Sequence, residues 1–259
     1  MADLRTDIHT DTRTDSHTDT RTDIHIDPLF FGLAGVSSRG YLGWSSCVLL
    51  TVNGKRVLFD TCGYNERAEL VRRLAERQLT PADIDVVILS HIHFDHAVNV
   101  GLFAKAAVYI HEIDMLHAHD NLHDNFKGDL AVPVEILPML DARKNVHILT
   151  GTSGTCAGIN WFLAPGHTPG LIALEITNTQ RCVVLASDAV KNLESLTLGT
   201  IQNTWDEAAT KQTFAEVAAR ATHILPGHDG WLERTPAGFG RTDPPTVAIH
   251  TQHTWHIHV

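Results

Sequence analysis

The chain has 259 residues, of which 43% are hydrophobic, and its formal net charge at pH 7 is −10. This length and composition are enough for one large domain with a buried core. Nucleic-acid binding normally needs a basic surface that neutralises phosphates, so the acidic balance favours a small-molecule substrate and argues against a nucleic-acid partner.

The cysteine content indicates a reducing compartment. Four cysteines are widely scattered and lack CxxC spacing: Cys47, Cys62, Cys156 and Cys182. No apolar run approaches the ~20 residues that span a bilayer, and the amino terminus lacks the apolar core of a secretory signal. We therefore expect a cytoplasmic protein without a membrane partner, for which a homodimer remains open.

The amino terminus carries an octad repeat, at residues 5–12 and 13–20, with a truncated third copy from Arg21. The repeat is rich in Thr, Asp and Arg and has few apolar side chains to bury, so residues 1–26 are predicted to be a disordered tail. Its histidines lie among aspartates and could hold a transition metal weakly, but a solvated tail is the favoured interpretation: His9, His17 and His25.

The following residues, 27–240, are predicted to form the folded domain. Two β-rich runs at 45–52 and 55–59 flank Asn53-Gly54, a pair that tolerates the positive φ of a type I′ hairpin turn. Residues 65–78 have the apolar spacing of a helix with one buried face.

A second part of the domain alternates strands with helices. Thr80 and Pro81 are typical of the N-cap and first position of a short helical turn. Residues 85–90 are continuously apolar, as in a strand buried on both faces. Further strands are predicted at 146–149, 159–163, 171–177, 181–186 and 222–225, and a helix at 206–221. This pattern predicts an α/β fold.

A dense cluster of metal-type ligands, His91-Ile-His93-Phe-Asp95-His96, follows the apolar strand at 85–90 directly. Alternate residues of an extended segment project to the same side, so His91 and His93 can share one metal. The following turn can direct Asp95 and His96 towards a second metal.

Three later residues have the same setting, an apolar strand that ends in a tight turn: His167, Asp188 and His228. Gly and Pro in or near these turns allow sharp bends close to a metal. A lone histidine is more typical of a hydrogen-bonded structural residue. Seven such side chains at strand ends instead predict a metal site.

Together, the HxHxDH cluster, Gly-His167, Asp188, Gly-His228, the Phe59-Asp60-Thr61 strand end and the Asn-Gly hairpin resemble the metallo-β-lactamase superfamily over roughly residues 30–235. The resemblance implies an αββα four-layer sandwich, in which two sheets pack face to face between outer helices and the site lies at one edge.

Carried over by position, the resemblance implies two metal-binding groups. One metal would be bound by His91, His93 and His167, the other by Asp95, His96 and His228, with Asp188 bridging both. Asp60 would orient ligands, as metal sites commonly need, although a plain strand-end turn is an equal alternative.

This site predicts a hydrolase. Two divalent ions ~3.5–4 Å apart can hold a bridging water and make hydroxide available near neutral pH. The hydroxide would attack an ester, lactone, thioester or amide carbonyl, with Asp95 and Asp188 as the catalytic carboxylates. Nitrogen and carboxylate ligands without thiolate favour two zinc ions, with iron, manganese or cobalt as alternatives. Cys62 is expected to be a small buried residue.

The substrate remains open within this resemblance. Acyl-homoserine lactonases commonly have a tyrosine three residues after the bridging aspartate, where this chain has Lys191, and the segment after Asp188 also differs from that of glyoxalase II. Residues 96–103 resemble a small family that includes nucleases. A phosphodiesterase or nuclease, an iron-dependent dioxygenase of the same fold, and a non-catalytic binding domain are the alternatives.

Residues 111–139 are predicted to be the substrate loop, with an exposed helix and loop as the alternative. Phe126 and Leu130 could form an apolar wall for an acyl chain, and Lys191 could receive a substrate carboxylate or carbonyl unless it is solvated. The polar residues of this stretch include His117, His119, Asp120, His123 and Asp124. The remaining residues, 241–259, form a His-rich segment that is expected to lie on the surface.

Overall fold

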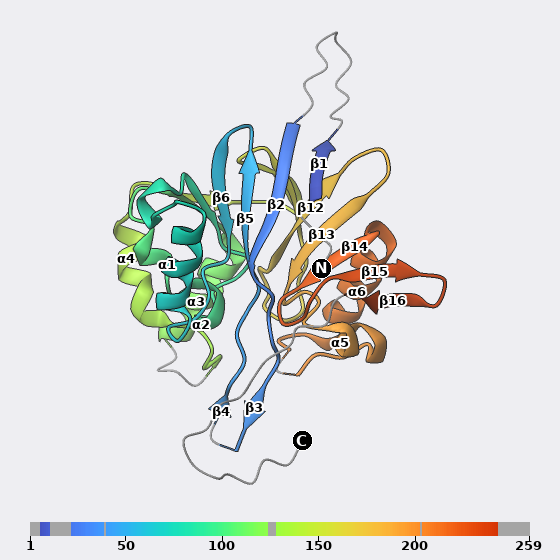
Figure 1. Cartoon of the computed structure of the whole chain (residues 1–259). Helices are drawn as coiled ribbons and strands as arrows, with labels where there is room; N and C mark the ends of the chain where they lie inside the picture. Colours follow the sequence, from blue (N-terminus) through green and yellow to red (C-terminus); the bar gives the residue numbers. More distant parts are fainter. Residues whose placement is uncertain (1–5, 11–21, 39, 124–127, 203, 243–259) are drawn as a thin grey trace, which may run out of the picture.

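Two β-sheets lie between two layers of helices in the computed structural model, which describes residues 6–10, 22–38, 40–123, 128–202 and 204–242 (Figure 1). Helices α1, α3 and α4 cover one side of the sandwich, and α5 and α6 lie on the other. The described helices are α1 (Arg67–Glu76), α2 (Phe94–Ala97), α3 (Glu112–His123), α4 (Leu137–Ala142), α5 (Leu193–Leu198) and α6 (Glu207–Arg220). The predicted αββα sandwich is confirmed.

The first sheet has seven strands in the order β1-β2-β5-β6-β7-β8-β9. Its hairpin between β5 and β6 turns at Asn53 and Gly54, whose φ angles of 50° and 80° confirm the predicted positive-φ turn. The last four strands run parallel. The strands are β1 (Thr6–Thr10), β2 (Thr22–Phe30), β5 (Cys47–Val52), β6 (Lys55–Phe59), β7 (Val86–Ile88), β8 (Ala107–His111) and β9 (Val146–Leu149).

The second sheet also has seven strands, in sequential order from β10 to β16. Only β13 and β14 run parallel within it. Its strands are β10 (Ser153–Cys156), β11 (Ile159–Leu163), β12 (Ile172–Thr177), β13 (Cys182–Ser187), β14 (His223–Pro226), β15 (Leu232–Thr235) and β16 (Gly238–Arg241). A separate hairpin, β3 (Val36–Ser37) and β4 (Gly40–Tyr41), projects from the bottom of the view in Figure 1.

Three layers of apolar side chains hold the sandwich together. Alternation along β5 places Leu49 in the core beneath the helices and Leu50 in the core between the sheets. Leu70 and Leu74 of α1 complete the first core, and Phe214 of α6 packs on the outer face of the second sheet. Burial on both faces explains why the central strands are almost continuously apolar.

The predicted disorder of residues 1–26 is wrong for residues 6–10 and 22–26. Strand β1 pairs with β2 in antiparallel register, and β2 pairs with β5. The truncated third repeat has isoleucine at alternate positions, so Ile24 and Ile26 reach the core between the sheets. The folded domain therefore begins before residue 27.

Residues 111–139 form helices joined by a loop, in agreement with the helix and loop that were the alternative to a substrate loop. Most of the stretch is helical, in α3 and α4. Residues 124–127 lie outside the described part, as do residues 243–259 of the His-rich segment.

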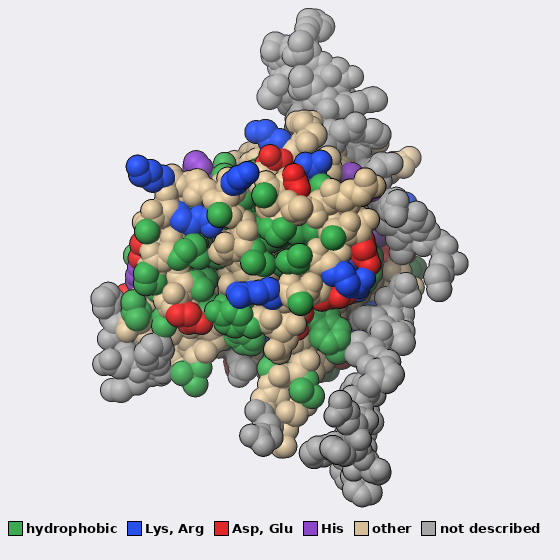
Figure 2. Space-filling view, turned by 60° about the vertical axis from the view of Figure 1, so that its left-hand side comes forward, with side chains coloured by type: hydrophobic (Ala, Val, Ile, Leu, Met, Phe, Trp, Pro, Cys, Tyr) green, Lys and Arg blue, Asp and Glu red, His purple; other side chains and the backbone are tan. Residues whose placement is uncertain are grey.

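None of the described helices is long and apolar enough to cross a membrane. Figure 2 shows that Lys and Arg alternate with Asp and Glu on the visible face rather than gathering by sign.

Candidate metal centre and active site

The seven predicted ligands meet at one edge of the sandwich. Strands β6 and β7 are parallel neighbours, so Asp60 and His91 follow strands that end at the same edge. Strands β13 and β14 are parallel neighbours as well, which brings Asp188 and His228 together. His167 lies in the loop between β11 and β12. His91, Asp188 and His228 therefore follow strand ends, as the sequence indicated, whereas Asp95 and His96 lie in the short helix α2.

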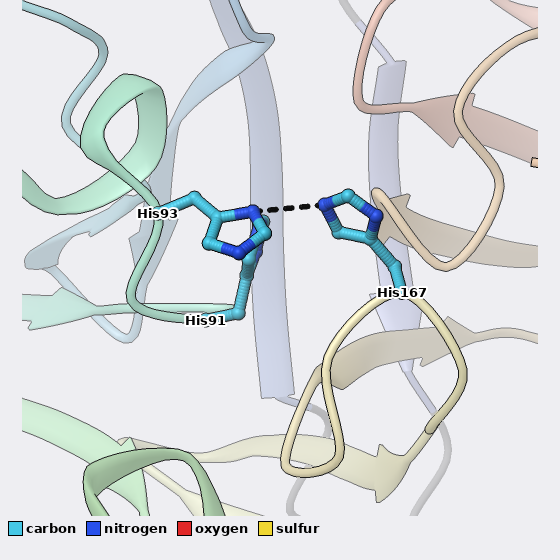
Figure 3. Close-up of side chains that lie close together, drawn as sticks. All are labelled: His91, His93 and His167. Carbon is cyan, nitrogen blue, oxygen red and sulfur yellow. Dashed lines mark hydrogen bonds between the residues drawn. The ribbon is translucent and has the colours of Figure 1, made fainter. Parts of the chain in front are cut away.

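These side chains form three overlapping groups, in each of which the candidate ligand atoms lie within 4.8 Å of one another. Figure 3 shows the first, in which the Nδ1 atom of His93 lies 2.9 Å from the Nε2 atom of His167. The groups are His91, His93 and His167; His91, His96 and Asp188; and Asp95, His96 and His228.

Asp188 lies between the two histidine clusters. Its Oδ1 atom is 3.2 Å from the Nε2 atom of His96 and 3.1 Å from that of His228. Its Oδ2 atom is 3.2 Å from the Nε2 atom of His167. The two carboxylate oxygens thus face different clusters, which is the arrangement that a bridging ligand needs. A Cβ at Gly227 would lie 1.9 Å from Oδ1, so only glycine fits there.

Most of the histidines are held by the ring nitrogen that faces away from the centre. His91 Nδ1 lies 2.9 Å from Ser90 Oγ, and His96 Nδ1 lies 2.8 Å from Asp60 Oδ2. His228 Nδ1 lies 2.9 Å from the Trp44 carbonyl oxygen, and His93 Nε2 lies 2.8 Å from Asp129 Oδ2. Partners of this kind orient the rings of metal-binding histidines.

Several buried atoms at the centre have no hydrogen-bond partner: His91 Nε2, His96 Nε2, His167 Nδ1 and Asp188 Oδ1. Buried polar atoms are rarely left unpaired. All four atoms belong to residues of the candidate ligand groups. The donor set of imidazole and carboxylate therefore fits divalent transition metals.

The pKa values favour the protonation states that bind metal. Burial and the surrounding imidazoles hold the pKa of His91 well below its usual range, and burial does the same for His167. Burial opposes ionisation of Asp188, but His228 and Lys191 outweigh it and lower its pKa. Neutral imidazoles and an ionised carboxylate are the forms that coordinate a metal.

His96 shows the opposite effect. Burial lowers its pKa, but the carboxylates of Asp95, Asp188 and Asp60 outweigh burial and raise it well above the usual value. Three carboxylates around one imidazole create a negative potential that attracts a cation. A metal ion between these groups satisfies the same potential.

Asp60 contacts His96 directly and is not a plain strand-end turn. Its Oδ2 atom also accepts hydrogen bonds from the hydroxyls of Ser90, at 2.8 Å, and Ser187, at 3.0 Å. Its Oδ1 atom accepts one from the Ser90 backbone N–H at 2.8 Å. The fully buried carboxylate thus joins the two sheets behind the ligands.

Asp114, which no sequence motif singled out, connects two ligand loops. Its Oδ2 atom accepts a hydrogen bond of 2.6 Å from the backbone N–H of Ile92, which lies between two ligands. Its Oδ1 atom accepts one of 2.6 Å from the hydroxyl of Thr168, which follows His167. A lone acid at the start of α3 carries no sequence signal for this role, because it depends on tertiary packing.

A cavity of about 760 Å³ opens above the centre. His93, Asp95, His167 and Asp188 line its floor. Apolar side chains from three separate segments line its walls, among them Val36, Leu130, Leu198 and Ile201. The predicted apolar wall at Leu130 is therefore confirmed as part of the cavity, whereas Phe126 lies outside the described residues.

Lys191 points into this cavity and is not a solvated lysine. Its Nζ atom lies 3.3 Å from Asp188 Oδ2, and its side chain is 20% exposed. The position therefore places a cation beside the carboxylate that faces both histidine clusters.

Tyr41 also lines the cavity, and no sequence motif singled it out. Its hydroxyl lies 2.7 Å from Nδ1 and 3.3 Å from Nε2 of His228, and the two rings are nearly perpendicular. Burial, with the carboxylates of Asp95 and Asp188, raises the pKa of Tyr41, so the phenol keeps its proton. Nothing in the sequence indicated this contact, because Tyr41 in the β3–β4 hairpin is far from the ligand motifs along the chain.

Of the other polar residues singled out, His117 contacts Asp129, whose carboxylate also contacts His93, and His119 contacts the exposed Asp141 away from the cluster. Asp124 lies outside the described residues. Cys62 is fully buried, which confirms it as a small buried residue.

The sequence matches the Metallo-beta-lactamase superfamily over residues 41–227, and the chain belongs to this superfamily. Together with the His/Asp cluster, this makes it a metallo-hydrolase of the metallo-β-lactamase fold. A probable metallo-hydrolase of Methanocaldococcus jannaschii is 25% identical over 174 residues, which cover 67% of this chain and 71% of that protein.

Two further relatives match over shorter regions. An N-acyl homoserine lactonase of Bacillus thuringiensis is 29% identical over 128 residues, 48% of this chain and 46% of that enzyme. A 32% match to cleavage and polyadenylation specificity factor subunit 3-I of Arabidopsis thaliana covers 28% of this chain and only 10% of that protein.

Among solved structures, the dizinc quorum-quenching lactonase AidC is similar in fold, with a TM-score of 0.62 at 16% identity. The similarity covers 95% of this chain and 100% of AidC.

Proposed function

We propose that the protein is a zinc-dependent hydrolase that cleaves an ester, lactone or thioester bond. The observation that carries this proposal is the pair of histidine clusters that share Asp188, with buried ligand atoms that lack other partners. The lactonase relatives, one of them dizinc, support both the metal and the bond class.

The proposed ligands form two sets. His91, His93 and His167 would hold one ion; Asp95, His96 and His228 would hold the other; and Asp188, which contacts histidines of both sets, would help to hold both. When bound, two divalent ions lower the pKa of a water molecule and so supply hydroxide near neutral pH.

The chain's own residues position the substrate around this centre. The Lys191 cation can attract the carbonyl oxygen as it gains negative charge. Tyr41, next to His228, can donate a hydrogen bond to the leaving oxygen or sulfur because its phenol keeps its proton. Asp95 lies on the cavity floor, where it can orient the attacking water.

The cavity favours a substrate with an apolar arm. The exposed side chains of Val36, Leu130 and Leu198 surround the opening and have no core to pack against. An acyl chain that covers them would gain about 25 cal/mol for each Å² of apolar surface removed from water.

A substrate panel tests the proposed function. Zinc-loaded protein would be assayed with an N-acyl lactone, a thioester, an aryl ester and a phosphodiester, each before and after removal of metal by a chelator. We expect chelator-sensitive turnover of the carbonyl substrates, restored by zinc. Turnover of the phosphodiester alone would instead support a nuclease, and oxygen consumption by an iron-loaded form would support a dioxygenase. No turnover with both ions bound would contradict a hydrolase.

A further inference from the structure

Residues 128–131 form a short segment between two cavities. Gly128, Asp129 and His167 line both the cavity above the metal centre and a second one of about 460 Å³ that also contacts His117 and Trp205. Asp129 is the acidic side chain in this wall, and none of the ligand motifs includes it.

The backbone of Asp129 is fixed by one side chain of α3. The Asn121 amide donates a hydrogen bond of 2.6 Å to the Asp129 carbonyl oxygen and accepts one of 2.7 Å from the Asp129 backbone N–H. A Cβ at Gly128 would lie 2.4 Å from the Asn121 amide oxygen, so glycine is needed beside this contact. The segment is therefore held tightly to α3.

The two carboxylate oxygens of Asp129 have separate partners. Oδ1 accepts a hydrogen bond of 3.0 Å from the Ala131 backbone N–H, which fixes the orientation of the carboxylate within the loop. Oδ2 lies 2.8 Å from the Nε2 atom of His93 and 3.3 Å from that of His117. One oxygen thus fixes the loop, and the other faces the histidines.

This contact determines which nitrogen of His93 faces the centre. A neutral imidazole carries one proton. The Asp129 carboxylate accepts hydrogen bonds and, when ionised, has no proton to donate. The proton of His93 therefore stays on Nε2, and the lone pair of Nδ1 points towards His167.

The two clusters are supported differently. Asp60, which holds His96, is 1% exposed and is fixed by both sheets. Asp129, which holds His93, belongs to a cavity wall and depends on α3. The adjacent backbone also contacts the ligand segment, because the Phe94 N–H donates to the Ala131 carbonyl oxygen at 2.8 Å.

We propose that Asp129 is a positioning residue that holds His93 in its metal-binding tautomer and couples the cavity wall at residues 128–131 to the His91, His93 and His167 site. The inference rests on the proposed metal centre. It assigns to Asp129 an effect on the affinity for one ion, separate from any contact with substrate.

Metal affinity tests this role without any substrate. Asp129→Ala and Asp129→Asn would be compared with the unchanged protein by competition between the zinc-loaded chain and a chromogenic chelator. Removal of such a partner typically weakens metal binding about 10- to 100-fold. We expect that loss for one of the two ions in Asp129→Ala. A smaller loss is expected in Asp129→Asn, whose amide oxygen can still accept from His93.

The matched control is Asp141→Asn. Asp141 pairs with His119 at 3.2 Å in the same part of the chain, but this pair is exposed and does not reach the cluster. Both ions should stay bound with unchanged affinity in this variant. Circular dichroism of each metal-free variant would separate a local effect from a loss of folding.

Cobalt substitution gives a second readout. Reorientation of His93 should change the visible absorption bands of cobalt in Asp129→Ala and leave those of Asp141→Asn unchanged. If folded Asp129→Ala binds both ions as tightly as Asp141→Asn, with the same cobalt spectrum, the inference is wrong while the proposed hydrolase stands. If the unchanged protein binds no metal, the proposed function itself fails.

Discussion

The floor and the rim of the cavity are built in different ways. The floor consists of buried ligands whose orientation is fixed by side chains from both sheets, such as Asp60. The rim consists of exposed apolar side chains from three unconnected segments; Val36 is 74% exposed, Leu130 81% and Leu198 74%. Folding thus determines the metal site, whereas the rim can change with little effect on stability and is suited to substrate selection.

Asp188→Ala tests the floor most severely. The substitution removes the carboxylate that faces both histidine clusters, so at least one ion should be lost. We expect kcat/KM to fall at least about 1,000-fold, equivalent to about 4 kcal/mol of transition-state stabilisation. Metal content and steady-state kinetics would measure the effect, with Asp141→Asn as the control. Retention of both ions and activity within tenfold of the unchanged protein would contradict the bridging role.

Asp60→Ala should chiefly destabilise the floor. It removes a buried carboxylate that accepts hydrogen bonds from the Ser90 backbone N–H and from the Ser90 and Ser187 hydroxyls and that contacts His96, so the free energy of unfolding of the metal-free protein should fall by about 3 kcal/mol. Urea denaturation would measure this change. Asp85→Ala, which removes an exposed acceptor for the Arg56 N–H, should cost clearly less. An equal loss of unfolding free energy in the two variants would contradict the larger stabilisation that we expect from the buried network.

Tyr41→Phe lies between floor and rim. Loss of one hydrogen bond to the reacting group should lower kcat/KM about 10- to 100-fold, with little change in metal content or melting temperature. Tyr64→Phe is a suitable control because Tyr64 is exposed and does not line the cavity. If both variants keep full activity, the phenol has no role in the reaction.

Leu198→Ser should have the smallest effect and tests the rim. We expect KM to rise severalfold for a long-chain acyl substrate and to stay unchanged for its acetyl analogue, since only the long chain reaches this side chain. The free energy of unfolding should change by less than about 0.5 kcal/mol. Leu116→Ser, at an exposed position outside the cavity lining, is the matched control. Equal KM changes for both acyl lengths would argue against an apolar arm.

The floor of the cavity could be predicted from the sequence, whereas several residues that support and surround it could not. The floor was predictable because each segment that carries ligands comes shortly after an apolar strand, and strand ends at one edge of the sandwich meet after folding. Asp129, Asp114 and Tyr41 were not, because their contacts join segments tens of residues apart and leave no local pattern. The amino terminus was misjudged because Ile24 and Ile26 are too few to suggest a strand until β5 provides a partner.

Metal content of the unchanged protein tests the central claim most directly. Tag-free protein, loaded with zinc and freed of excess metal by gel filtration, would be measured by elemental mass spectrometry together with its protein concentration. We expect two zinc ions per chain, because two histidine clusters share Asp188. A stoichiometry that stays at one ion per chain, with zinc in excess during loading, would contradict a dinuclear centre.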